Sequence, residues 1–222
     1  MIQINLPYWI HDNYFIFKPH FNGLITDYLD IIIKYNKLIF SDYNELEDIV
    51  QIITDNKNFN PYNHIGSGFN QLLTNSLDKL INLTQIIFGE NFNQPLEKSL
   101  VQLTNLTHIT FGYHFNQPLQ ESLYYLTKLE FLKLGHEFNQ ELYLPPNIKI
   151  LALDCNNQNL IDSLPNSIEQ LNLDINFNLP LDNLPSSIKK ISFDKDSDYN
   201  ISLTNLPKSL KQLELPEYYR LI

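Results

Sequence analysis

The side chains of this sequence most able to take part in chemistry are its six histidines, its one cysteine and one run of acidic residues. His108, His114 and His136 lie close enough in the sequence to suggest a metal-binding cluster. A metal site needs ligands that converge on one point and neighbours that hold them in place. The repeat described below places these histidines at different positions of successive units. We therefore expect surface or contact histidines and no metal site.

The acidic run Asp194-Lys195-Asp196-Ser197-Asp198 has the alternating carboxylates of a calcium-binding loop. Tyr199 occupies the position where an EF-hand loop needs glycine, and Asn205 occupies the position of its bidentate glutamate. The run is therefore more typical of a solvated turn, with a loose calcium contact as the alternative.

Cys155 is the only cysteine, and no residue near it in the sequence is suited to act as the base for a thiol nucleophile. The sequence also has no glycine-rich phosphate loop, no nucleophile elbow and no zinc-ligand spacing. We therefore predict no catalytic, cofactor-binding or metal-binding residues, and a protein that is not an enzyme.

Composition and charge narrow the compartment and the possible partners. With 43% hydrophobic and 18% charged residues, the chain is expected to fold. A net charge of −10 with a single arginine, Arg220, argues against binding to nucleic acid or to an acidic membrane. The N-terminus lacks a signal-peptide pattern, the lone cysteine cannot form an internal disulfide, and no apolar run is long enough to span a bilayer. These features predict an intracellular protein that is not secreted.

An internal period organises most of the chain. Phe-Asn-Gln recurs every 23 residues, at 69–71, 92–94, 115–117 and 138–140. Leucines follow at a constant offset, and farther along the units shorten and begin with Leu-Pro instead. The offset leucines are Leu80, Leu103 and Leu126, and the later units begin at Leu144, Leu164, Leu184 and Leu206. A period of this length indicates stacked structural units, or coils, of about 19 to 25 residues.

Each unit contains a short strand-like frame, such as residues 83–88 or 168–173, that resembles the L-x-x-L-x-L pattern of leucine-rich repeats. Alternation along the frame turns its fourth and sixth residues inward and leaves its third and fifth residues on the other face. We therefore predict an α/β repeat fold, a leucine-rich-repeat-like solenoid. It has a parallel β-sheet on the concave face and return segments that are mostly irregular, 3-10 or short helical.

The third and fifth strand positions of successive units should form one continuous face, starting with Tyr62 and His64. Exposed apolar residues within a polar rim are typical of protein interfaces. We expect a partner protein to contact this face, and the alternative is that its residues simply cover the strands. The predicted contact residues are Ile87, His108, Thr110, Phe131, Lys133, Ile150 and Asn172.

The Phe-Asn signature itself is expected to have two internal roles. Each phenylalanine should point into its coil and stack on the phenylalanine of the next, and each asparagine amide should bond unpaired backbone groups at the corner. The predicted structural residues are Phe69, Phe92, Phe115, Phe138 and Phe177, with Asn70, Asn93, Asn116, Asn139 and Asn178.

The signature Phe-Asn-Gln-Pro-Leu at 92–96 and 115–119 resembles the FNIP repeat family, a branch of the leucine-rich repeats found in social amoebae and in giant DNA viruses of amoebae. The looser resemblance covers roughly residues 60–215. It implies a non-catalytic interaction scaffold and, for a viral member, a place in the host cytoplasm. Some family members carry an N-terminal F-box and resemble substrate receptors of ubiquitin ligases. The N-terminal residues 6–10 are similar to the Leu-Pro opening of an F-box.

Two functional hypotheses follow. The first is a scaffold that binds a partner protein along the concave sheet face, and the alternative is a substrate-recruiting subunit of a ubiquitin ligase with a degenerate F-box-like N-terminus. The expected organisation is an N-terminal cap with degenerate coils over 1–60, repeats over 61–215 and a C-terminal cap over 216–222. Apolar residues at helical spacing predict a short helix near 45–55, in the return path of an early coil.

Overall fold

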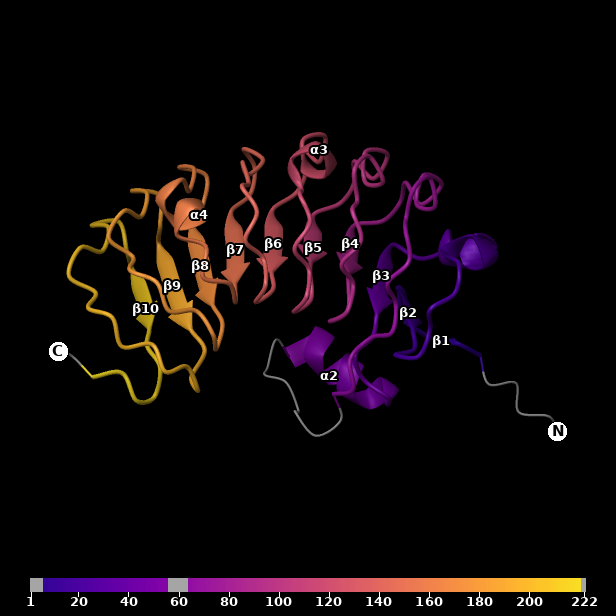
Figure 1. The fold of residues 1–222 in the computed structure, drawn as a ribbon, viewed down its shortest axis with the longest axis horizontal. Coiled ribbons are helices and arrows are strands. Elements are labelled where there is room, and N and C mark those ends of the chain that lie inside the picture. The colour runs from indigo at the N-terminus through magenta and orange to yellow at the C-terminus, as the bar shows by residue number, and fades with distance from the viewer. Residues whose placement is uncertain (1–5, 56–63, 221–222) are drawn as a thin grey trace.

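The computed structural model describes residues 6–55 and 64–220, which form a single row of coils (Figure 1). Each regular coil contributes one short strand, turns a corner and returns through an irregular or briefly helical segment. Figure 1 shows the strands along one side of the row, with α3 and the return segments along the other side. The predicted repeat fold with a parallel sheet is confirmed.

The sheet follows the order of the chain without a crossover. The strands β1 and β2 pair antiparallel as a hairpin, and every later neighbour pairs in parallel. The ten strands are β1 (Tyr8–His11), β2 (Tyr14–Phe17), β3 (Lys37–Phe40), β4 (Gln85–Ile87), β5 (His108–Thr110), β6 (Phe131–Leu134), β7 (Ile150–Leu153), β8 (Gln170–Leu173), β9 (Lys190–Phe193) and β10 (Gln212–Glu214).

The helices are short, as expected for return segments, apart from one longer helix. They are a 3-10 helix at Ile25–Tyr28, α1 (Leu29–Ile32), α2 (Leu46–Asp55), α3 (Gln120–Leu123) and α4 (Gln158–Asp162). No helix among the described residues is both long and apolar enough to cross a bilayer.

A column of phenylalanine rings runs through the interior of the row. Phe69, Phe92, Phe115 and Phe138 are at most 1% exposed. Successive rings lie nearly parallel, with centroids 5.9, 6.0 and 6.4 Å apart. The rings are farther apart than neighbouring strands, which lie roughly 4.8 Å apart, and each coil contributes one ring to the stack. Each ring therefore covers the ring of the coil before it.

A second aromatic column, which the sequence reading missed, comes from the last inward position of the strands. Phe88 and Phe111 stack at 5.2 Å, and both are buried. The two columns also touch within each coil, since the ring of Phe111 lies 4.0 Å from that of Phe115. Burial of each such side chain contributes roughly 1.5 to 3 kcal/mol, so the paired columns are a main source of coil stability.

The Phe-Asn column is interrupted in one coil, where Asn157 occupies the slot between Phe138 and Phe177. Asn157 is only 6% exposed, and both the nitrogen and the oxygen of its side-chain amide make hydrogen bonds. Its Nδ2 donates to the Gln140 carbonyl at 3.0 Å, and its Oδ1 accepts from the Leu160 amide at 3.1 Å. The second bond caps α4, which the sequence reading did not predict. The column resumes with Phe177 and Tyr199, whose centroids lie 6.2 Å apart.

The signature asparagines form a ladder along the surface of the row. The side-chain oxygen of Asn93 accepts from the Asn116 amide at 2.9 Å and from the Gln117 side chain at 3.0 Å. Asn70 and Asn116 repeat the pattern one coil earlier and one coil later. The expectation that each asparagine amide bonds backbone groups of its own corner is wrong. The side-chain oxygen instead accepts from a backbone amide of the following coil. The reason is that the corners stack directly, which brings each Oδ1 to the next coil's amide.

Gly112 and Gly135 lie where consecutive corners approach most closely. A Cβ at Gly112 would lie 2.3 Å from the Gly89 oxygen, and a Cβ at Gly135 would lie 2.0 Å from the Gly112 oxygen. Neither glycine is explained by a positive φ, since the only positive-φ glycine among the described residues is Gly66. Close backbone contact between coils therefore explains these glycines.

A long insertion lies between the strand and the Phe-Asn corner of the third coil. Phe92 follows Phe88 by four residues, whereas Phe69 follows Phe40 by 29. The rings of Phe40 and Phe69 still meet at 4.0 Å, like those of the regular coils. The extra residues leave after β3 and return at His64, which forms an isolated bridge with Tyr43. The expected strand containing His64 is therefore wrong, since β4 pairs directly with β3; Tyr62 lies outside the described residues.

The insertion carries α2, and this helix packs on the sheet face opposite the core. Ile49 forms a buried cluster with Ile16 and Ile39, which alternate along their strands with core-facing residues. Ile52 and Ile53 pack against the same cluster at helical spacing. The helix was predicted near 45–55, and its presence is confirmed, but its expected place in the return path is wrong. Figure 1 shows α2 beside the strands, away from α3.

The two ends of the row are closed to different degrees. At the N-terminal end the β1–β2 hairpin extends the sheet, and Tyr8 stacks on Phe15 at 4.6 Å. At the C-terminal end the ring of Tyr219 continues the aromatic column at 6.2 Å from Tyr199. Leu213, in the inward position of β10, nevertheless remains 37% exposed. Residues 216–220 therefore cover only part of the last coil.

Replacing Phe115 by alanine tests the aromatic column. The ring is fully buried between coils, so its loss should lower the free energy of unfolding by about 3 to 5 kcal/mol in denaturant melts. Tyr124→Ala is the control, because Tyr124 is 76% exposed and should cost less than about 0.5 kcal/mol. A loss below about 1 kcal/mol for Phe115→Ala would show that the ring is not in the core.

Replacing Asn116 by alanine tests the ladder. The change removes the acceptor for the Asn139 amide and the Gln140 side chain, so we expect a loss of about 0.5 to 1.5 kcal/mol in the same melts. Asn116→Asp keeps an acceptor oxygen in place and should retain most of the stability. If both variants lose the same amount, the accepted hydrogen bonds are not the cause.

Candidate functional site: the open strand face

The residues opposite the core form two parallel rows along the sheet, which we call the open strand face. Strand register places His108, Phe131 and Ile150 in one row and Thr110, Lys133, Ala152 and Asn172 in the other. All seven predicted partner-binding residues lie on this face. Whether a partner contacts them stays a prediction.

The N-terminal part of the open strand face is already covered within the chain. Ile87 packs against the cluster that α2 forms with Ile16, Ile39 and Ile49. Ile87 therefore contributes to an internal contact, and its role as a free contact residue needs correction. The sequence signal was available in the apolar spacing of α2, but the sequence does not show on which face a helix packs. The uncovered part of the face begins at β5.

The first row is apolar at its centre. The imidazole of His108 stacks on the Phe131 ring at 5.5 Å, and Ile150 is the register neighbour of Phe131 on the next strand. Burial lowers the pKa of His108. The charge of Glu130 raises this pKa, and the charge of Lys37 lowers it further. The histidine is therefore uncharged at neutral pH, and the centre of this row presents aromatic and aliphatic surface.

The second row is held by an ion pair that spans three strands. Lys133 on β6 reaches across β7 to Asp174, just beyond the end of β8, at 2.5 Å. Ala152, the only alanine of the chain, lies between them in register with Lys133. A larger side chain at this position would obstruct the lysine, so the alanine leaves its path open. The sequence pattern does not predict this pair, because the two residues lie 41 positions apart.

The pKa values of the two aspartates beside this row shift in opposite directions. Burial would raise the pKa of Asp174, but the Lys133 ammonium outweighs it and holds that pKa below its ordinary value. Burial raises the pKa of Asp154, and the nearby Asp174 carboxylate adds to the effect. Lys133 is therefore the cation that makes a carboxylate pair tolerable at this corner.

Asn172 anchors a small polar network on the same face. Its Oδ1 accepts from the Gln170 side chain at 2.8 Å and from the Ser192 hydroxyl at 3.0 Å. Farther along, Lys190 pairs with Glu214 at 3.0 Å. The uncovered face is thus an apolar centre followed by polar groups that already have partners.

The histidines singled out for metal binding do not converge. His114 pairs with Glu137 at 3.0 Å, while His136 stacks on Tyr113 at 4.8 Å. His108 lies on the open strand face. Each of the three histidines therefore makes its own contact with a neighbouring side chain.

Cys155 and the acidic run 194–198 provide no reactive site. Cys155 is buried, and its burial raises the pKa of the thiol to about 12, so the thiol stays protonated at neutral pH. In the acidic run the Asp194 side chain accepts from the Asp196 amide at 2.8 Å, and Ser197 is buried. These contacts are those of a turn.

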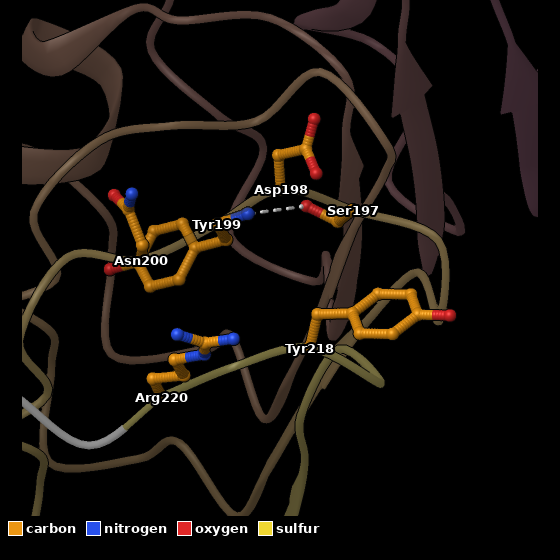
Figure 2. A pocket seen from close by; sticks show the side chains of 6 residues that line it. All are labelled: Ser197, Asp198, Tyr199, Asn200, Tyr218 and Arg220. Carbon is orange, nitrogen blue, oxygen red and sulfur yellow. Dashed lines mark hydrogen bonds between the residues drawn. The ribbon is translucent and has the colours of Figure 1, made fainter.

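An open hollow of about 400 Å³ lies at the C-terminal end of the row. Figure 2 shows its lining, with Tyr199 and Arg220 on opposite sides and the Ser197 hydroxyl bonded to the Tyr199 amide at 3.2 Å. Ser197 and Tyr199 are core residues of the last coils. The hollow therefore lies where the last coil is only partly covered, and it is not a shaped ligand pocket.

One group among the described residues has the composition and geometry to hold a metal ion. Asp42, His64 and Glu90 place their ligand atoms within 4.8 Å of one another. The sequence reading missed this group, because His64 was assigned to a strand. A signal was present: Asp42 lies three residues beyond Ile39 and Glu90 three residues beyond Ile87, and these two isoleucines pair in the sheet, so the acidic residues occupy equivalent corners.

A pair of exposed aromatic residues lies elsewhere on the molecule. Tyr124 and Tyr125, which follow α3, are 76% and 52% exposed and pack edge to face on each other. They belong to the return side of the row, opposite the strands. Any test of the open strand face therefore needs this side as its comparison.

Comparisons with known proteins agree with this architecture. The FNIP Repeat family model matches residues 138–176, 156–196 and 175–218. No curated protein matches the chain. The matched residues are those of the shorter Leu-Pro coils, while the two Phe-Asn-Gln-Pro-Leu copies lie upstream of them.

Two solved structures are similar to this chain. The giant-virus protein CroV588, described as a novel circular LRR protein structure, has 24% identity and a TM-score of 0.61. The match covers 98% of this chain and 32% of CroV588. An internalin, InlF, from Listeria monocytogenes has 14% identity and a TM-score of 0.48, over 91% of this chain and 60% of the internalin. The chain thus spans about a third of CroV588 and three fifths of the internalin. The chain is thus a leucine-rich-repeat-like solenoid whose residues 138–218 match the FNIP Repeat family model.

Proposed function

We propose that this protein is a non-catalytic scaffold that binds a partner protein on the uncovered part of the open strand face, from β5 to β9. The observation that carries the proposal is the row of His108, Phe131 and Ile150, which presents uncharged apolar surface next to polar groups. A central apolar anchor within a polar surround is the usual composition of a protein interface.

The fixed polar groups of the second row support the same proposal. Lys133 and Asn172 are already oriented by their bonds to Asp174 and Ser192. Side chains held in place lose little rotational freedom when a partner binds, which lowers the cost of association. The face is therefore preorganised for a partner.

The nature of the partner follows from charge. The chain has a net charge of −10, and Lys133 and Lys190 on the uncovered part of the face are paired with carboxylates. A polyanion would meet no free cationic cluster on this face, so a protein surface with apolar side chains fits better than a nucleic acid or an anionic membrane.

The ubiquitin-ligase alternative gains no support from the N-terminal residues that suggested it. Tyr8–His11 and Tyr14–Phe17 are paired strands of the sheet, not helices of an F-box. We therefore retain the scaffold proposal without a ligase role.

Replacing Phe131 by alanine tests the proposal. In affinity capture from host-cell lysate with quantitative mass spectrometry, proteins retained by the wild type should be reduced by about tenfold or more with Phe131→Ala, since loss of an interface anchor costs about 2 kcal/mol or more. Denaturant melts establish that the variant is folded.

Tyr124→Ala is the matched control, because it removes an aromatic side chain of similar size from the return side of the row. It should leave capture unchanged. If Phe131→Ala retains the same proteins as the wild type, or if Tyr124→Ala is the variant that loses them, the open strand face is not the binding surface.

A further inference from the structure

Three potential metal ligands from separate parts of the chain meet at the neck of the α2 insertion. Asp42 lies just after β3, where the insertion leaves the coil, and His64 lies where it returns. Glu90 belongs to the corner after β4 in the next coil. The neck is closed by the Ile65 amide, which donates to the Asp42 carbonyl at 2.9 Å. The three side chains are brought together by the strand order and not by their proximity in sequence.

The distances suit a transition-metal ion. All three ligand atoms lie within 4.8 Å of one another, and His64 Nε2 is 3.5 Å from Glu90 Oε2. Two ligands that are each about 2.1 Å from a tetrahedral zinc ion are separated by about 3.4 Å. The histidine and the glutamate already have this separation, and the Asp42 ligand atom lies within 4.8 Å of both.

The surrounding contacts orient the ligands as a built site requires. Asp42 Oδ1 accepts from the Ser67 amide at 2.6 Å and from the Glu90 amide at 2.7 Å, so these bonds do not need its second oxygen. The Tyr43 ring meets the His64 imidazole edge to face at 5.5 Å. Metal ligands are typically held by such neighbouring contacts.

Gly66 leaves the space that the glutamate occupies. A Cβ at this residue would lie 2.7 Å from Glu90 Oε2, and its φ of +75° is itself unfavourable for other residues. The carboxylate therefore lies directly against the backbone of the returning chain. His64 and Glu90 are 21% and 28% exposed, so an ion can reach them from solvent.

We propose that Asp42, His64 and Glu90 form a binding site for a divalent transition-metal ion such as Zn²⁺, with solvent as the remaining ligand. One imidazole and two carboxylates are donors that zinc accepts, and the ion offsets the charge of two neighbouring carboxylates. The site is independent of the proposed partner binding. Its metal fastens both ends of the insertion to the next coil and thereby holds α2 against the open strand face.

Calorimetric titration of the chelator-treated, full-length protein with zinc chloride tests the site. We expect one zinc ion per chain to bind and the unfolding temperature to rise with zinc concentration, because only the folded chain assembles the ligands. His64→Asn and Glu90→Gln should each weaken zinc binding by about tenfold or more, since even loss of an orienting neighbour costs about 10- to 100-fold. Asp42→Asn should do the same, while keeping an oxygen for the two amides.

His114→Asn is the matched control. His114 also faces a glutamate in a nearby corner, at 3.0 Å, but the pair belongs to no three-ligand group within the described residues. This variant should bind zinc like the wild type. The absence of zinc binding by the wild type would overturn the proposal. So would equal affinity in the wild type, His64→Asn and Glu90→Gln, or binding of calcium in preference to zinc. Circular dichroism of the metal-free variants verifies that they are folded.

Discussion

The whole structure depends on the burial of each coil's interior by its neighbours. A strand of three or four residues presents only one or two inward side chains, too few to form a core of its own. Stacking joins these side chains into continuous columns, of which the two phenylalanine columns are the most regular. The parallel strands, the asparagine ladder and the tightly approaching glycines all follow from placing identical corners directly on one another.

The same constraint separates the parts of the chain that hold the fold from those free to vary. Inward strand positions and the Phe-Asn corner are committed to stacking, whereas alternation leaves two rows of residues on the opposite face. The α2 insertion shows that this face accepts an additional element, since Ile16 and Ile39 are buried there without any contribution to the main core. The remainder of the face, centred on Phe131, keeps its apolar residues uncovered by the chain. Asp42, His64 and Glu90 lie at the neck of the insertion, where the proposed metal site would fasten α2 to the next coil.

Much of the fold was predictable because each repeat unit places the same types of residue at the inward strand positions and at the corner. The 23-residue spacing predicts the register of β4, β5 and β6, and the buried positions of Phe92 and Phe115 agree with the repeat. The insertion was not predictable from spacing, since Phe69 keeps the 23-residue offset to Phe92 while lying 29 residues beyond its own strand partner, Phe40. The face on which α2 packs, the reach of Lys133 to Asp174 and the convergence at His64 depend on three-dimensional contacts between coils. An isolated sequence pattern does not specify such contacts.

The dependence of each coil on its neighbours is tested most directly by hydrogen exchange with mass spectrometry on the wild type and on Phe115→Ala. Removing the ring leaves a void that borders the coils before and after it. We expect faster exchange in the peptides that contain β4 and β6 as well as in the one that contains β5. Faster exchange restricted to the coil of residue 115, with unchanged protection in β4 and β6, would contradict the view that the coils stabilise one another by stacking.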